Sequence, residues 1–183
     1  MKLAATLICD VIEKLNRFQD APEDKKSVLV FLPGLFEIFE FIDYLTEAYE
    51  PLWVCQHLEL VPLHSALCEE EQERAFKSSQ RLDGKRKVIV ATNIAESSIT
   101  IPDVKYVVDF MLAKELHYDP VTKSESLQLA WASKAAARQR AGRAGRVADG
   151  LVFRLCSEKF FRNAVPEYPK PEMQRCPLEK LVL

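Results

Sequence analysis

The sequence of 183 residues lacks the usual marks of a membrane protein, of a disulfide-stabilised fold and of a zinc site. No apolar run approaches the length of a membrane-spanning helix, and the first residues lead quickly into charged positions. We therefore expect neither a membrane span nor a signal peptide. The 5 cysteines are scattered and never form Cys-x-x-Cys, and the 3 histidines have no metal-ligand spacing. These absences predict a reducing compartment and no metal bound by this chain.

The chain also lacks the glycine-rich loops that hold nucleotides in many proteins. Neither GxxxxGK[ST] nor GxGxxG occurs, so the chain has no phosphate cradle that would hold a nucleotide alone. An excess of positive charge is missing as well, because the formal net charge is -2. This charge excludes a broadly basic, generic nucleic-acid binder. The segment from Glu37 to Glu73 holds ten acidic residues and no lysine or arginine.

The most informative segment is the run Gln139-Arg140-Ala141-Gly142-Arg143-Ala144-Gly145-Arg146. Its glycines allow close backbone approach, and its arginines offer planar forks of donors that suit phosphate oxygens. The alanine-rich residues before it predict a helix with Ser133 as its N-cap. If that helix continues, Gln139, Arg143 and Arg146 lie on one face. The alternative is a solvated basic helix end or a calmodulin-type basic segment.

Elsewhere, the apolar pattern predicts strands and helices that alternate along the chain. Short, continuous apolar runs are typical of strands buried on both faces. We expect such strands at 27–32, 58–63, 87–92, 104–110 and 150–155. Helical spacing predicts helices at 2–19, 35–49 and 69–77, with a polar loop or short helix at 93–100. Alternation around a central Asp119-Pro120 predicts a β-hairpin at 112–130.

This order of elements requires crossover connections between strands. It predicts an α/β fold, an open and mostly parallel sheet with helices on both faces. Ligands of such sheets bind at the carboxyl ends of the strands. Gly34, His64-Ser65 and Thr92-Asn93 each follow a predicted strand, so we expect them to share one edge with the arginine-rich helix. We expect one domain over 1–165, and a proline-rich, surface-running connector over 166–183.

Two of these segments resemble motifs of one protein family. Residues 92–100 (TNIAESSIT) and 139–146 (QRAGRAGR) resemble motifs V and VI of the DEAH-box RNA helicases. Residues 28–34 (VLVFLPG) resemble motif IV, and residues 63–65 with 70–76 resemble the segment between motifs IV and V. Because order and spacing also fit, the chain resembles the second RecA-like domain, or helicase C-terminal domain, of such an enzyme.

The resemblance extends beyond the motifs. Residues 171–178 (PEMQRCPL) are similar to the family's lead into a winged-helix domain. Residues 109–110, 127–134 and 172–178 are most similar to the tudor-domain-containing members that act in the germline piRNA pathway. That similarity implies a role in RNA-mediated silencing, piRNA-pathway proteins as partners, and a cytoplasmic location in germ granules.

A helicase resemblance implies that the chain is the C-terminal motor domain of an ATP-dependent RNA helicase. ATP would bind between this domain and a first RecA-like domain that supplies the phosphate loop and most ligands of Mg²⁺. RNA would run across both domains, and hydrolysis would open and close the cleft between them. Because the first RecA-like domain and the DEAH acids are absent from this chain, we expect the chain alone to be inactive.

The resemblance also implies nucleotide contacts for particular residues. Arg143 and Arg146 would be arginine fingers on the β- and γ-phosphates, where they stabilise charge during phosphoryl transfer. Gln139 would order the attacking water or contact the γ-phosphate. Phe76 would stack on adenine, with an ordinary core position as the alternative. Residues near the ribose or the domain interface would be Thr100 and Asp103.

For RNA, the implied contacts are Ser65, Thr92 and Asn93, with Asn93 coupling the RNA and nucleotide sites. The alternative for Thr92 and Asn93 is a strand-end cap. Two positions depart from the family pattern. Many members carry an acid where this chain has Pro102, which puts ribose recognition by the next residue in doubt. Ser97 replaces a usual threonine and keeps the hydroxyl group.

Two other functions stay open on the sequence. One is a non-hydrolysing RNA-binding or scaffold module that keeps the fold, against which the intact Gln139, Arg143 and Arg146 argue. The other is a DNA motor of the same superfamily, since none of these residues senses a 2′-hydroxyl group.

Overall fold

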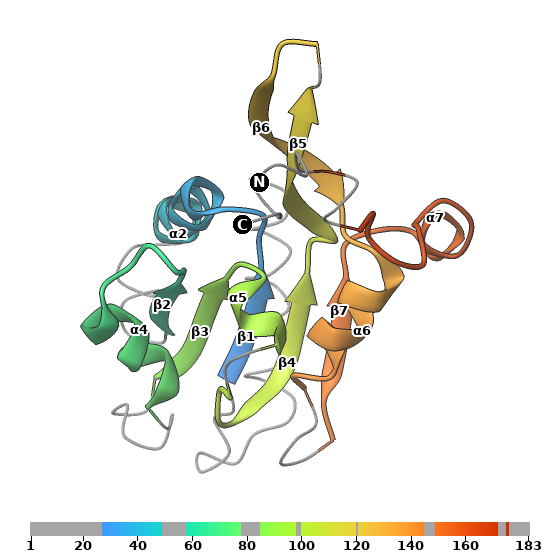
Figure 1. Ribbon diagram of the computed structural model, residues 1–183. Coiled ribbons are helices and arrows are strands. Elements are labelled where there is room, and N and C mark those ends of the chain that lie inside the picture. The colour runs from blue at the N-terminus through green and yellow to red at the C-terminus, as the bar shows by residue number, and fades with distance from the viewer. Residues whose placement is uncertain are drawn as a thin grey trace.

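A five-stranded sheet in the order β2-β3-β1-β4-β7 forms the centre of the molecule (Figure 1). The computed structural model describes residues 27–48, 58–77, 85–97, 100–119, 121–144, 149–171 and 175. The predicted helix at 2–19 and the predicted site residue Arg146 lie outside the described residues. The strands are β1 (Ser27–Phe31), β2 (Leu58–Leu63), β3 (Arg86–Ala91), β4 (Val104–Asp109) and β7 (Leu151–Arg154).

All four neighbouring pairs of this sheet are parallel, as the continuous apolar runs predict. Every residue of β1 and β3 is buried, and apolar side chains fill both faces except at the first positions, where Ser27, Arg86 and Lys87 are buried. β2 lies at an end of the described sheet, and its Pro62 is in register with Val90 of β3. Proline is tolerated there because an outer strand leaves one row of backbone donors unpaired.

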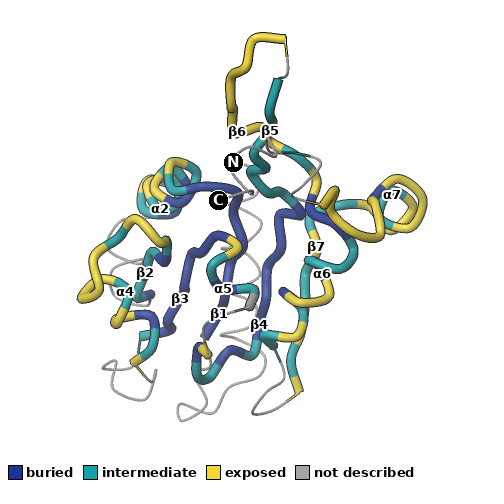
Figure 2. Tube along the Cα trace, in the orientation of Figure 1, coloured by how far each residue is buried: buried dark blue, intermediate teal, exposed yellow. Residues whose placement is uncertain are grey.

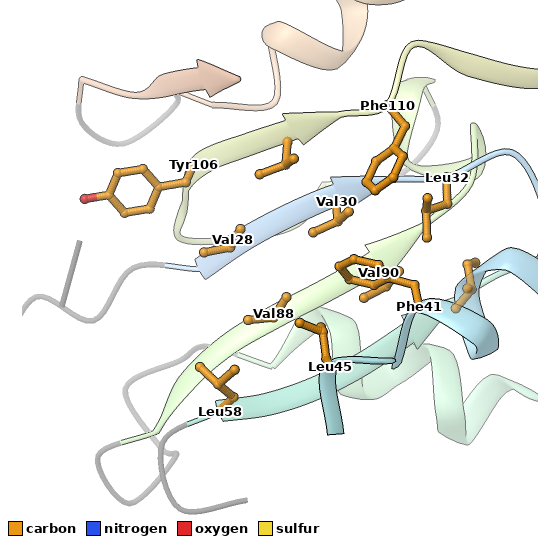
Figure 3. Packing of buried hydrophobic residues seen from close by; sticks show 12 residues of the cluster. Val28, Val30, Leu32, Phe41, Leu45, Leu58, Val88, Val90, Tyr106 and Phe110 are labelled. Atoms are coloured by element: carbon orange, nitrogen blue, oxygen red, sulfur yellow. The ribbon is translucent and has the colours of Figure 1, made fainter. Parts of the chain in front are cut away.

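Helices cover both faces of the sheet, so the predicted α/β fold is confirmed. Alternate residues of β1 point to opposite faces, with Val28 and Val30 on one face and Leu29 and Phe31 on the other. The first pair packs with Ile38, Phe41 and Leu45 of α2 (Leu35–Ala48), as Figure 3 shows. The second pair packs with Ala75 of α4 (Glu69–Phe76) and Ala95 of α5 (Ile94–Ser97). Within the described residues, no helix is both long and apolar enough to cross a membrane.

The carboxyl ends of the strands meet at one edge. Phe31, at the end of β1, is in register with Ala91 of β3 and with Asp109 of β4. Ala91 is in turn in register with Leu63, the last residue of β2. This edge, which we call the carboxyl edge, brings the turns that follow β1, β2, β3 and β4 close together.

The predicted β-hairpin is confirmed and projects from the carboxyl edge (Figure 1). Strands β5 (Leu112–Asp119) and β6 (Ser124–Trp131) pair antiparallel, and the far part of β6 is exposed (Figure 2). At the tip, Asp119 Oδ1 accepts a hydrogen bond from the backbone N–H of Val121 at 2.8 Å, which lowers the pKa of Asp119. At the base, Lys114 donates to Glu37 of α2 at 2.8 Å. A β-carbon at Gly34 would meet both of these charged groups, at 2.7 and 2.6 Å, so a larger residue there would have to displace this ion pair.

The structure clarifies two features of the second half of the chain. Helix α6 (Lys134–Ala141) begins after the predicted N-cap Ser133 and ends at Gly142, so the condition under which Gln139 and Arg143 share one helical face is not met. Its C-cap N–H donates to Arg138 O at 2.9 Å, and Arg143 N donates to Arg140 O at 3.1 Å. A short helix α7 (Glu158–Asn163), which the sequence reading missed, follows β7, and Ser157 is its N-cap. Glycine ends α6 because of its low helix propensity.

The first residues of the predicted connector are tied to α6. The carbonyls of Pro166 and Glu167 accept hydrogen bonds from the N–H groups of Lys134 and Ala135, at 2.9 and 3.0 Å. These are donors of the first helical turn, which have no partner within the helix. The division into 1–165 and 166–183 stays a prediction.

Candidate functional site

The turn after β3 carries two predicted RNA contacts, Thr92 and Asn93. Their carbonyl oxygens accept hydrogen bonds from Ala95 and Glu96, at 3.2 and 2.9 Å, and so start helix α5. Thr92 is buried, at 5% exposure, whereas Asn93 is exposed. Asn93 is therefore more accessible to a ligand than Thr92. The backbone carbonyls of both residues also cap the start of α5, which agrees with the alternative of a strand-end cap.

The third predicted RNA contact, Ser65, lies in the turn after β2. His64 shapes this turn, because its Nδ1 atom accepts a hydrogen bond from the backbone N–H of Ala66 at 3.0 Å. Ser65 is exposed. Since β2 neighbours β3, the structure brings the Ser65 turn and the Thr92 turn to the same edge, as the sequence predicts.

Phe76 ends helix α4 on the face of the sheet that also carries α5. It is partly buried and packs against the same core cluster as Ile94 and Ala144. Lys87 holds this end of the helix, since its Nζ atom donates to the carbonyls of Ala75 and Lys77 at 2.7 and 2.6 Å. Burial lowers the pKa of Lys87 to about 8, although Glu59 and Asp103 act in the opposite direction. This half-buried position suits either role predicted for Phe76.

Thr100 and Asp103 lie in the connection that leads to the amino end of β4. Asp103 has a positive φ of 63°, and its carbonyl accepts a hydrogen bond from the N–H of Ser27, the first residue of β1, at 2.8 Å. Asp103 is thus at the opposite edge of the sheet from Thr92 and Asn93, and the structure does not bring these residues together. The ribose contact at Asp103 stays a prediction.

Helix α6 places its arginines in different surroundings. Arg138 is exposed and pairs with Glu167 at 2.6 Å. Arg140 is buried: its Nη1 atom donates to Asp109 Oδ1 at 2.7 Å and its Nε atom donates to Glu96 Oε1 at 2.7 Å. The same Nη1 atom contacts Leu112 O at 3.2 Å. Arg140 therefore joins α5, the end of β4 and the base of the hairpin.

Opposing effects act on the pKa values of Arg140 and Glu96 in this buried cluster of Arg140, Glu96 and Asp109. Burial acts to lower the pKa of Arg140, but Asp109 and Glu96 together outweigh it and raise the pKa. Burial raises the pKa of Glu96, and the nearby charges of Arg140 and Arg143 oppose that rise. The guanidinium carbon of Arg140 also lies 5.1 Å from the centre of the Phe31 ring. A charge so well paired suits a fixed structural joint better than a group that binds a ligand.

Of the predicted catalytic residues, Gln139 is exposed near the end of α6 and Arg143 is partly buried in the turn after it. Arg143 lies close enough to Glu96 to affect its pKa. Thus Arg143 and the turn that holds Thr92 and Asn93 flank the same short helix, α5. The structure thus brings one predicted nucleotide contact, Arg143, and two predicted RNA contacts, Thr92 and Asn93, to the same short helix.

The sequence analysis missed the roles of Arg140, Glu96 and Asp109. One available signal is the spacing of Arg140 three residues after Ala137, which places both on the buried side of α6. An arginine on a buried helix side needs acidic partners. Its partners lie 44 and 31 residues away in sequence, so local patterns do not reveal which acids they are.

A separate cavity of about 450 Å³ lies between the hairpin and the connector, away from these residues. Tyr118, Trp131, Tyr168 and Arg175 contribute to its wall. The connector is held against the hairpin by a hydrogen bond from Tyr118 N to Arg175 O at 3.1 Å. None of the predicted site residues that the structure describes lines this cavity.

Comparisons with known proteins agree with the fold. Residues 8–148 match the helicase conserved C-terminal domain, and the chain belongs to that family. The human ATP-dependent RNA helicase TDRD9 is 49% identical over 160 residues, which are 87% of this chain and 11% of that protein. The probable ATP-dependent RNA helicase spindle-E of Aedes aegypti is 42% identical over 180 residues, 97% of this chain and 13% of that protein.

A solved structure shows the same architecture. The crystal structure of the Escherichia coli DExH-box NTPase HrpB aligns with a TM-score of 0.81 and 30% identity, over 98% of this chain and 20% of that one. The predicted resemblance to a RecA-like helicase C-terminal domain is confirmed, and spindle-E proteins are among the relatives. The chain spans about a tenth of the length of its curated relatives.

Proposed function

We propose that this chain is the C-terminal motor domain of an ATP-dependent RNA helicase of the DEAH-box type. The observation that carries the proposal is the joint at Arg140. It links α6, which leads to Arg143, with α5, which follows directly from Thr92 and Asn93. A motor domain needs such proximity, because its ATP and RNA contacts must respond to one another.

For ATP, the residues present fit a phosphate-facing role. Arg143 and, by the motif resemblance, Arg146 supply guanidinium groups that suit phosphate oxygens, and Gln139 offers an exposed amide. Bound ATP would supply the phosphoanhydride bond that is hydrolysed. The described residues contain no group of acidic, histidine or cysteine side chains that could hold a metal ion. We therefore assign Mg²⁺ mainly to the first RecA-like domain.

For RNA, the proposed contacts are the polar groups at the carboxyl edge, and the hairpin would guide the strand. The exposed apolar residues of β6, Leu127 and Leu129, are 66% and 60% exposed. Side chains of this kind can pack on bases without reading their sequence. We further propose a cytoplasmic protein, located in germ granules and acting with piRNA-pathway proteins, in keeping with its likeness to spindle-E.

The test of this function compares the full-length protein with this chain alone. The full-length protein should hydrolyse ATP with Mg²⁺, and single-stranded RNA should increase the rate, whereas this chain should not exceed background because it lacks a phosphate loop. Steady-state phosphate release measures both. Mg²⁺-dependent turnover by this chain alone would contradict the assignment of the phosphate loop and the Mg²⁺ ligands to the first RecA-like domain. RNA binding by a full-length protein without turnover would favour the scaffold module.

RNA binding by this chain should be weak and depend only slightly on salt. Hydroxyl and amide groups of Ser65, Thr92 and Asn93 can bond phosphate without releasing many counterions. We expect a Kd of about 10⁻⁴ M or weaker at physiological salt. The dependence of affinity on salt concentration should correspond to the neutralisation of about two or three phosphates rather than six to ten. Fluorescence anisotropy during a salt titration measures both quantities. Micromolar binding with a steep slope would reveal a dominant basic surface instead.

In the full-length protein, Thr92→Ala should weaken RNA binding and RNA-stimulated turnover more than turnover without RNA. A matched control is Thr46→Ala in α2, where the hydroxyl group donates to the carbonyl of Ile42 at 3.0 Å, within its own helix. Equal losses in both variants would argue against a contact with RNA at Thr92.

A further inference from the structure

Glu96 and Asn93 belong to one turn of backbone. Helix α5 is only four residues long, and the Glu96 N–H donates to the carbonyl of Asn93 at 2.9 Å. A shift of Asn93 therefore moves the Glu96 backbone with it. The Glu96 side chain carries this movement out of α5, because it accepts the hydrogen bond from Arg140.

Arg140 and Arg143, on the α6 side of this ion pair, are also joined by a backbone hydrogen bond. The Arg143 N–H donates to the carbonyl of Arg140 at 3.1 Å, in the turn that ends α6. Two backbone hydrogen bonds and one ion pair thus connect Asn93 to Arg143. The charge of Arg143 also opposes the rise in the pKa of Glu96, which places the two residues in the same electrostatic environment.

The three charged side chains of this cluster differ in their exposure to solvent. Arg140 and Asp109 have side chains with 1% and 0% exposure, whereas the Glu96 side chain is 14% exposed. Asp109 Oδ1 also accepts from the N–H of Met111 at 2.8 Å, which fixes it to the start of the hairpin. Asp109 therefore ties Arg140 to the base of the hairpin, and Glu96 is the member of the cluster through which α5 can act on Arg140.

We propose that the Glu96–Arg140 ion pair transmits RNA contact at Thr92 and Asn93 to the nucleotide-facing Arg143. Glu96 and Arg140 are then positioning residues that touch neither ATP nor RNA. This inference rests on the function proposed above. Its consequence is reciprocal, because a link that lets RNA alter the nucleotide site must let nucleotide alter RNA affinity by the same factor.

The test measures this reciprocal coupling in the full-length protein. The RNA Kd is determined by anisotropy without nucleotide and with a saturating, non-hydrolysable ATP analogue. In the native protein the two values should differ by roughly 5- to 150-fold, the usual range of coupling between sites. In Glu96→Gln, which keeps the side-chain shape and an acceptor oxygen but removes the charge, the ratio should fall to within about two-fold of one.

Two further variants distinguish a loss of coupling between the two sites from a loss of the folded structure. Arg140→Lys keeps the charge but loses the forked geometry, so it should also lose the coupling. The double variant should lose no more than either single variant, because both interrupt one link. The control is Glu167→Gln, which alters the exposed ion pair of Arg138 on the same helix and should keep the coupling. Melting temperatures establish that each variant is folded, and a folded Arg140→Lys decides the question if Glu96→Gln is not folded.

The possible outcomes are distinct. Coupling that persists in folded Glu96→Gln and Arg140→Lys overturns the inference but leaves the helicase function intact. A native protein that binds both ligands without coupling also overturns it. A native protein that binds neither the ATP analogue nor RNA overturns the proposed function itself.

Discussion

Replacing Arg143 by alanine in the full-length protein should reduce ATP turnover by about 10³-fold or more. Arg143 leaves α6 beside Glu96, where its guanidinium group would face the phosphates held by the first RecA-like domain. Charge builds on those phosphate oxygens during transfer, and a positioned guanidinium group stabilises it. The motif resemblance predicts a loss of the same size for Arg146→Ala. Steady-state ATP hydrolysis at saturating RNA measures the effect.

The matched control for this prediction is Arg138→Ala. Arg138 lies on the same helix, is exposed and pairs with Glu167, so its removal should leave turnover within a few-fold of the native value. Melting temperatures should hardly change in the Arg143 variant if its role is chemical. Turnover that survives Arg143→Ala would make the arginine-finger assignment wrong, and a large fall in melting temperature would point to a structural role.

The second large effect concerns stability. Arg140→Ala should lower the free energy of unfolding of this domain by about 3–5 kcal/mol, because it leaves the fully buried carboxylate of Asp109 without its cation. For a domain of this size, that loss corresponds to a fall in melting temperature of roughly 6–20 °C. Thermal and urea unfolding of the purified domain measure the change. Arg138→Ala should cost at most about 0.5 kcal/mol.

A double variant tests the cause of this loss. If the cost comes from an unpaired buried charge, Asp109→Asn combined with Arg140→Ala should recover part of the stability that Arg140→Ala loses alone. The Asp109→Asn change removes the charge of the carboxylate and keeps the shape of that side chain. A double variant that is less stable than Arg140→Ala would show that the loss comes from packing around Arg140 instead.

Local patterns were sufficient to predict the sheet. The runs at 28–32 and 88–91 are apolar because β1 and β3 are buried on both faces, and alternating residues around Asp119-Pro120 predicted the hairpin that β5 and β6 form. Helix α7 was missed because its six residues are too few to show a clear helical period. The sequence left open whether the helix continues through the arginine run, and the structure shows that it ends at Gly142.

The candidate site was predicted only in part, because only part of it depends on local sequence patterns. The parallel pairing of β2 and β3 places Ser65, Thr92 and Asn93 at one edge, and parallel strands are what the alternation of strands and helices predicts. The cluster of Arg140, Glu96 and Asp109 depends on contacts between residues far apart in sequence, which no local pattern specifies. The resemblance to helicase motifs assigned roles within the arginine run, but it did not indicate that one of its arginines is buried.

The central claim is that this domain presents Arg143 to ATP while its carboxyl edge holds RNA. The most direct measurement is a structure of the full-length protein with Mg²⁺, ADP, an aluminium fluoride mimic of the transferring phosphoryl group, and single-stranded RNA. The account predicts that the Arg143 guanidinium nitrogens lie about 2.7–2.9 Å from the phosphate or fluoride atoms, the distance of a charge-assisted hydrogen bond. It also predicts that RNA phosphates contact the turn of Thr92 and Asn93. A complex in which Arg143 points away from the nucleotide, with RNA bound elsewhere, would contradict it.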